Sequence, residues 1–226
     1  MTKTFRLTTL AAMLAAASFG SHAAETADLA VKGTIRPSAC NVSISGNGLV
    51  DYGTISAVTL NDSTPTRLDD KMVTLTLNCD AATVVGVKAM DGRAGTASQS
   101  ISNFIYGSGG MGGMFGLGAV GGVNIGGYGI HRKVANQATA DSNLAASLSS
   151  DDGGTSWAVR TGGNAMLENE GRIHSWGDSG ATSPGSYAAI VQPYWIYTAI
   201  APKDSLPSLT GGVSLDGLVT FTVVYL

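Results

Sequence analysis

Apolar and polar side chains alternate along several segments, and this period of two constrains the fold more than any other feature of the sequence. In residues 71–79, KMVTLTLNC, one face carries Val73, Leu75, Leu77 and Cys79, while the residues between them point the other way. Successive side chains of a β-strand point to opposite faces, so this pattern predicts a strand with one buried face. Cys79 is expected to face the same core as the three aliphatic residues.

The same alternation recurs along the chain and predicts an all-β protein. It covers residues 29–35, 83–90, 186–201 and 217–226. Pro193 interrupts the third of these segments, which suits a bend or an edge strand because proline lacks the N–H that a ladder needs. In the last segment one face carries the apolar residues Val219, Phe221, Val223 and Tyr225.

Glycine is concentrated in the middle of the chain and argues against helices there. Residues 107–129 contain 12 glycines in 23 positions. Glycine at this density carries a large backbone entropy cost in a helix, so we expect a long loop or thin strands with closely packed backbones. Residues 135–148 are the one helix-like stretch. Charged residues make up 13% of the chain, well below the usual quarter.

The letters GLGAVGG, residues 116–122, spell the G-x-G-x-x-G pattern of dinucleotide-binding folds. That pattern binds a pyrophosphate only between a buried strand and the start of a helix. The residues before it, GSGGMGGMF, are no buried strand, and VNIGGYG after it cannot sustain a helix. We therefore expect no nucleotide and no other cofactor.

The first 23 residues have the features of a secretory signal peptide. Lys3 and Arg6 precede an uncharged run over residues 7–20, and Ser21 to Ala23 form a small-x-small cleavage site. Cleavage there predicts an exported chain of residues 24–226. Removal of Lys3 and Arg6 leaves 11 basic against 16 acidic residues, which argues against nucleic acid as a partner.

Cys40 and Cys79 are the two cysteines of the chain. In an exported protein they are expected to form a disulfide, which would close a loop of roughly 40 residues and stabilise the fold by ~4 kcal/mol on the chain-entropy account. His131 and His174 are the histidines beyond the leader. Two histidines and two distant thiols make a poor zinc site, so no metal is expected.

Three motifs resemble sites and receive structural interpretations. GDSG, residues 177–180, matches a serine-protease nucleophile loop but lacks the upstream histidine pattern. SDDGGTSW, residues 150–157, fits the S-x-D-x-G-x-x-W Asp-box and predicts a hairpin turn, with a calcium-binding turn as the alternative. Glu168 and Glu170 lie in a polar loop, which favours a solvated surface over a glycosidase pair. We therefore expect no catalytic residues and no enzyme.

The tryptophans leave a choice between packing and binding. Trp157 and Trp176 are candidate glycan contacts, because aromatic rings can stack on sugars. Burial in the core or in a turn is the other interpretation, and it is the favoured one.

Two regions carry a family resemblance. Residues 31–56, VKGTIRPSACNVSISGNGLVDYGTIS, and residues 215–226, LDGLVTFTVVYL, resemble the start and the end of chaperone–usher pilus subunits. The chain is still more similar to a bacterial fimbrial-like family of undefined function, of the DUF1120 type. The shared phrases include VDYGTIS, NCDA, FGLG, IGGYG and SDDGG, in this order.

The resemblance implies a pilin-type, immunoglobulin-like β-sandwich that lacks its final strand. It implies one domain over residues 24–226, with a glycine-rich and loop-rich insertion over 91–185. A strand from a periplasmic chaperone, and then the arm of another fimbrial subunit at the outer-membrane usher, would fill the gap. The implied interface consists of Val219, Phe221, Val223 and Tyr225, and Cys40 and Cys79 would tie the first strand to the interior.

The N-terminal segment decides whether the chain can itself donate a strand. Ala27, Leu29 and Val31 belong either to a free arm or to the first strand, and in the second case only residues 24–26 would remain as an arm. The expected function is a structural or adhesive fimbrial subunit, in the periplasm in transit and then on the cell surface. The alternative is a stand-alone secreted or surface carbohydrate-binding module.

Overall fold

The computed structural model describes residues 27–35, 38–107, 109–133, 137–159, 165–168 and 171–226. The predicted leader, residues 1–23, lies outside these ranges. The chain divides into Met1–Arg36 and Pro37–Leu226. Residues 27–35 of the first unit form neither helix nor strand, and every one of them is exposed. The second unit contains all the elements below.

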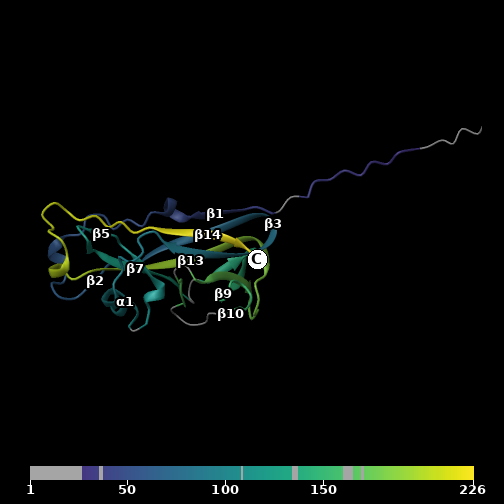
Figure 1. Ribbon diagram of the computed structural model, residues 1–226. Helices are drawn as coiled ribbons and strands as arrows, with labels where there is room; N and C mark the ends of the chain where they lie inside the picture. The colour runs from purple at the N-terminus through teal and green to yellow at the C-terminus, as the bar shows by residue number, and fades with distance from the viewer. Residues whose placement is uncertain (1–26, 36–37, 108, 134–136, 160–164, 169–170) are drawn as a thin grey trace, which may run out of the picture. The chain divides into compact units, whose positions relative to one another are not determined.

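The second unit is mostly strand, which confirms the predicted all-β class. Short 3-10 turns occur at Ser45–Gly48, Ala57–Thr59, Met111–Gly113 and Lys203–Ser205. The longer elements, labelled in part in Figure 1, are β1 (Cys40–Ile44), β2 (Thr66–Arg67), β3 (Lys71–Asp91), α1 (Gln99–Tyr106), β4 (Met114–Gly116), β5 (Ala119–Val120), β6 (Val123–Asn124), β7 (Gly126–Arg132), β8 (Ala138–Ala140), β9 (Asn143–Ser150), β10 (Ala158–Val159), β11 (Ala165–Met166), β12 (Ile173–Asp178), β13 (Ser186–Ile200) and β14 (Val219–Tyr225).

Among the described residues, twelve strands form one antiparallel sheet, and β5 and β6 form a separate hairpin. The order β3–β12–β9–β8–β13 returns to β3, because β13 also pairs with β3 directly. These five strands therefore close a ring of ladders. β7 extends the sheet beyond β13, and β1 and β14 extend it beyond β3.

Two long strands organise the sheet. The predicted strands at 71–79 and 83–90 are one strand, β3, and the segment at 186–201 is the single strand β13. Pro193 lies inside β13, opposite Thr74 of β3. On the other side of β13, β8 pairs up to Val191 and β7 pairs from Trp195. Proline is tolerated there because its position falls between these two ladders.

One apolar core fills the interior of the sheet. Leu75, Leu77 and Val87 of β3 are almost completely buried, as the alternation predicts. Much of the remaining core comes from residues 91–185, including Phe115, Ile130, Leu148, Leu167, Ile173 and Trp176. This segment supplies β4 to β12. It is thus an integral part of the sheet rather than the loop-rich insertion that the resemblance implied.

The glycine-rich segment is closely packed backbone, the second of the two predicted outcomes. Every residue of β7 is buried. A Cβ on Gly126 would lie 2.3 Å from the carbonyl oxygen of Ala199, and one on Gly116 would lie 2.5 Å from that of Arg93. Gly116 belongs to the apparent nucleotide fingerprint. Here the missing side chain of glycine lets neighbouring backbone segments of the sheet approach each other. No helix that could bind a phosphate follows these residues.

Replacement of Gly126 by alanine is expected to destabilise the fold by about 3 kcal/mol, because the new methyl group meets backbone that cannot rotate away. Equilibrium unfolding in urea measures the loss. Gly171→Ala is the matched control, since its Cβ would meet nothing within 4 Å. Equal stability of the two variants would show that the close packing at β7 is unimportant.

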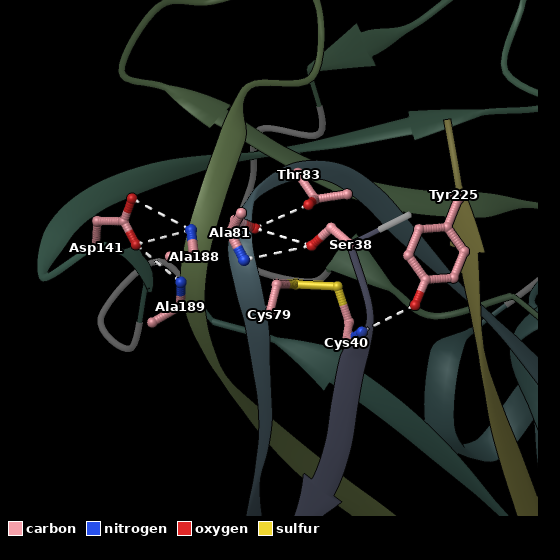
Figure 2. Close-up of a disulfide and its surroundings, with 9 residues drawn as sticks. All are labelled: Ser38, Cys40, Cys79, Ala81, Thr83, Asp141, Ala188, Ala189 and Tyr225. Atoms are coloured by element: carbon pink, nitrogen blue, oxygen red, sulfur yellow. Dashed lines mark hydrogen bonds between the residues drawn. A yellow bond between two sulfur atoms is a disulfide. The ribbon is translucent and has the colours of Figure 1, made fainter. Parts of the chain in front are cut away.

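The helix predicted at 135–148 is wrong: within its described part the chain forms the β8–β9 hairpin. Asp141 and Ser142 make its two-residue turn, with φ of 46° and 70°. Positive φ at both central residues is typical of tight hairpins, and aspartate tolerates it. The Asp141 carboxylate accepts hydrogen bonds from the backbone N–H groups of Ala188 and Ala189, which joins the turn to β13 (Figure 2).

Candidate functional site: an open strand edge

Two strands pair with separate parts of β3. Val219 to Tyr225 of β14 pair with Asp91 to Val85, and Cys40 to Ile44 of β1 pair with Cys79 to Leu75. The end of β14 therefore meets the start of β1. Within the part of the chain that the structure describes, neither strand has a partner on its other side. Apart from the N–H of Cys40, which donates to the Tyr225 hydroxyl, their outward N–H and C=O groups form a free ladder edge.

The apolar side chains of both strands point toward the core but remain partly exposed. Their cross-strand partners, such as Leu77 and Val87, are fully buried, which fixes the direction in which they point. Val42 is nevertheless 40% exposed and Tyr225 is 52% exposed. We call this row the open edge, and it consists of Val219, Phe221, Val223, Tyr225, Cys40, Val42 and Ile44. Five of its members pack against the main core, namely Cys40, Ile44, Val219, Phe221 and Val223, and no further described strand covers the row.

The predicted disulfide joins β1 to β3 at the point where the two halves of the open edge meet. Cys40 and Cys79 are bonded, with their Cα atoms 3.9 Å apart across the β1–β3 ladder. The Tyr225 phenol oxygen accepts a hydrogen bond from the N–H of Cys40 at 2.9 Å (Figure 2). Ser38 exchanges hydrogen bonds with the backbone of Ala81 just before β1. The C-terminal strand and the first strand thus meet at one fixed point.

Phe221 anchors the β14 half of the edge. Its ring stacks on Tyr194 of β13 with centroids 5.8 Å apart, and Val219 and Val223 pack beside it against the same core. The four C-terminal residues singled out in the sequence therefore share one face of a strand that pairs only with β3 among the described strands. Sequence reasoning missed Val42 and Ile44, although the alternation in CNVSI, residues 40–44, carries the signal.

The described residues of the predicted arm form no strand. Ala27, Leu29 and Val31 lie in no strand, and the sheet begins at Cys40. The exposed fractions of Leu29, Val31 and Ile35 are 90%, 89% and 102%. The prediction that the alternating residues 29–35 form a strand within the chain is therefore wrong. The first strand of the sheet is β1, so Ala27, Leu29 and Val31 lie outside it.

The Asp-box forms the predicted hairpin turn. The Asp152 carboxylate accepts hydrogen bonds from the N–H and hydroxyl of Ser156, and these bonds hold its pKa below the ordinary value. Gly153 and Gly154 have φ of 75° and 100°. The Trp157 indole N–H donates to the carbonyl of Gly154 at 3.0 Å. Because the turn itself occupies Asp152, this motif is a structural element. Among the described residues no group of acidic, histidine or cysteine side chains could hold a metal ion.

The burial of Trp176 contradicts its predicted role as a glycan contact. It lies on β12 inside the core, is 1% exposed, and donates its indole N–H to the side-chain oxygen of Gln192 at 3.0 Å. An aromatic ring that stacks on a sugar must reach solvent. Trp157 is half-buried in its own turn, so the two rings do not form a shared platform.

Comparison with known proteins places part of the chain near a described family. Residues 29–129 match the model of a family described as "Protein of unknown function (DUF1120)". The chain is similar to Protein GltF of Escherichia coli K12, with 36% identity over 101 residues that cover 40% of this chain and 39% of GltF. It is also similar to Uncharacterized protein YhcF of the same organism, with 25% identity over 95% of this chain and 98% of YhcF.

The chain thus spans less than half of GltF and nearly all of YhcF. The matched family region runs from the arm through β1, the disulfide and β3 to the glycine-rich β7. Among the described residues, no helix has the length and apolar character needed to span a membrane. These descriptions name no function. We therefore infer the function from the open edge and the residues of the predicted arm.

Proposed function

We propose that this chain is a structural subunit of a fimbria, and that its open edge accepts the N-terminal arm of another subunit. In this proposal the fold is a pilin-type, immunoglobulin-like sandwich that lacks its last strand. The observation that carries it is the row of partly exposed apolar side chains on β1 and β14, two strands that pair only with β3 among the described strands. An added strand would satisfy the free ladder edge and cover the row at once.

The arm has the pattern that such an edge requires. Leu29, Val31 and Ile35 alternate with polar or small residues, so an extended arm presents them all on one side. Full burial of one such side chain stabilises by about 1.5–3 kcal/mol. Three of them, with main-chain hydrogen bonds, offset the entropy that ordering the arm costs.

Before assembly, the same edge can pair unspecifically with strands of other chains, which leads to aggregation. In the proposal a strand from a periplasmic chaperone protects it after export, and an outer-membrane usher then exchanges that strand for the arm of the next subunit. The chain would pass through the periplasm and end at the cell surface. Adhesion to a host or surface glycan is no part of the proposal, because Trp176 is buried and Trp157 is engaged in its turn.

Arm variants test the proposal without disturbing the folded unit. Val31→Asp places a charge among the residues that would enter the open edge, and we expect it to weaken self-association at least tenfold, because its burial would desolvate a carboxylate. Copies of the full chain that carry two different tags are mixed, and their co-purification is measured. Thr34→Asp is the matched control, since it adds the same charge to the other side of the arm.

The control should associate like the unaltered chain. If Val31→Asp associates normally, or if both variants lose association equally, the arm does not insert its apolar side and the proposal fails. The folded unit is monitored in parallel by its unfolding transition, which neither variant should change because both positions are exposed.

A further inference from the structure

His131 lies in β7 with an imidazole that makes no hydrogen bond in the described structure. The residue is 2% exposed, and neither ring nitrogen has a partner among the described atoms. Its ring lies against two tyrosines, with centroids 4.9 Å from Tyr106 of α1 and 4.2 Å from Tyr197 of β13. A buried imidazole without hydrogen bonds is uncommon.

The charged groups around the stacked rings disfavour a further positive charge on the His131 imidazole. The Arg67 guanidinium lies 4.4 Å from the centre of the Tyr197 ring, and the Lys133 amine lies 5.1 Å from it. Asp70 is the nearby carboxylate from the β2–β3 connection, and it already pairs with Arg67 at 2.8 Å and with Lys133 at 3.7 Å. Glu168, which follows β11, is paired with Arg172. The groups that face the stack are therefore two cations, two engaged carboxylates and two phenols.

Burial, reinforced by Arg67, lowers the pKa of His131 to about 4. An exposed histidine titrates near 6.5. A folded-state pKa below the exposed value stabilises the closed arrangement above pH ~6.5, and this stabilisation is lost as the pH falls toward 4. His131 is accordingly neutral at pH 7 in the closed arrangement, and any opening that exposes it is favoured by acid.

α1 is the element that can open. Its buried residues pack in a small cluster separate from the main core, formed by Ile101, Met114, Ala199 and Ala201. The Ser102 hydroxyl is buried on α1 without a hydrogen-bond partner, which weakens this contact. The Tyr106 ring covers His131 on the sheet and donates its hydroxyl to the carbonyl of Gly113 at 2.8 Å. Release of α1 is thus the movement that uncovers the imidazole.

We propose that His131 is a pH-sensitive lock that holds α1 on the sheet near neutral pH and releases it in acid. The main core contains none of this stack, so the release is local. The equilibrium constant for opening should rise roughly tenfold per pH unit between about 6.5 and 4, as expected for uptake of one proton.

Native-state hydrogen exchange on the full chain tests the lock. After correction for intrinsic rates, the amides of α1 should lose about tenfold or more of their protection between pH 7 and pH 4.5, while those of β3 and β13 stay protected. His131→Phe keeps an aromatic ring in the stack but cannot take up a proton, so its α1 protection should not change with pH. A wild-type α1 that stays fully protected at pH 4.5, or an equal loss in His131→Phe, overturns the proposal.

A second measurement covers the case in which His131→Phe does not fold. The imidazole resonances of His131 in the unaltered chain are followed by NMR between pH 7 and pH 4.5. The lock requires that they show no protonation step near pH 6.5 while α1 is protected. Protonation near pH 6.5 while α1 remains protected would show that the imidazole is free to titrate and would overturn the proposal.

Discussion

Trp176→Ala is expected to lower the free energy of unfolding by about 3–5 kcal/mol, because the indole is the largest fully buried side chain of the core. The substitution leaves a cavity where β12 faces β13, and it also leaves the side-chain oxygen of Gln192 without its donor. Urea unfolding followed by circular dichroism gives the value. A loss of this size is a large fraction of the stability of a typical domain.

Two further variants separate the contribution of apolar packing from that of the hydrogen bond to Gln192. Trp176→Phe keeps most of the apolar volume but removes the hydrogen bond to Gln192, so its loss should be near 1–3 kcal/mol. Trp157→Ala removes a half-buried ring from a surface turn and should cost less than Trp176→Ala. If Trp176→Ala is as stable as the unaltered chain, the indole is not a core residue and its role as a ligand contact must be reconsidered.

Removal of the disulfide is expected to destabilise the fold by ~4 kcal/mol, since the bond joins residues separated by 39 positions and limits the unfolded chain. The double variant Cys40→Ser/Cys79→Ser tests this by urea unfolding. β1 should suffer most, because β3 is its only ladder partner among the described strands and Tyr225 its contact at the junction.

A reducing agent supplies the control for the disulfide. It should lower the stability of the unaltered chain to that of the double serine variant and leave the variant itself unchanged. A difference below about 1 kcal/mol between the oxidised and reduced chains would contradict the account, because β1 would then be held by other contacts.

The all-β class and the core face of β3 follow directly from the alternation in KMVTLTLNC. The same rule identified β14 and the side of it that carries Phe221. These predictions succeed because a half-buried strand imposes its period of two on the local sequence. The disulfide could also be predicted from the sequence, since the chain has two cysteines and begins with a leader-like segment.

Other features depend on contacts between distant segments, and the local sequence does not encode them. Residues 135–148 have helix-forming composition, yet tertiary pairing with β13 and β12 makes the described part a hairpin. Residues 99–106 gave no helix signal, but the Ser98 side chain caps α1 and the sheet supplies its apolar contacts. Trp176 was ambiguous because burial and stacking require the same residue type.

The glycine-rich segment shows the same limit. The density of glycine alone argued against a helix. The choice between a loop and packed strands depended on the positions of Ala199 and Arg93, which are distant in the sequence. The alternating arm likewise resembled a first strand until the register placed Cys40 at the start of β1. In the proposal, these residues form a strand only on the open edge of another subunit.

Hydrogen exchange at the open edge measures directly whether β14 and β1 accept the arm. The full chain with Leu29→Asp and Val31→Asp in its own arm serves as the acceptor, and a synthetic peptide of residues 27–35 is added in excess. The account predicts that the outward N–H groups of β14 and β1 gain at least tenfold protection. A peptide that carries Val31→Asp should give none. Unchanged exchange with the natural peptide, or equal protection by both peptides, would contradict the claim that the open edge accepts the arm.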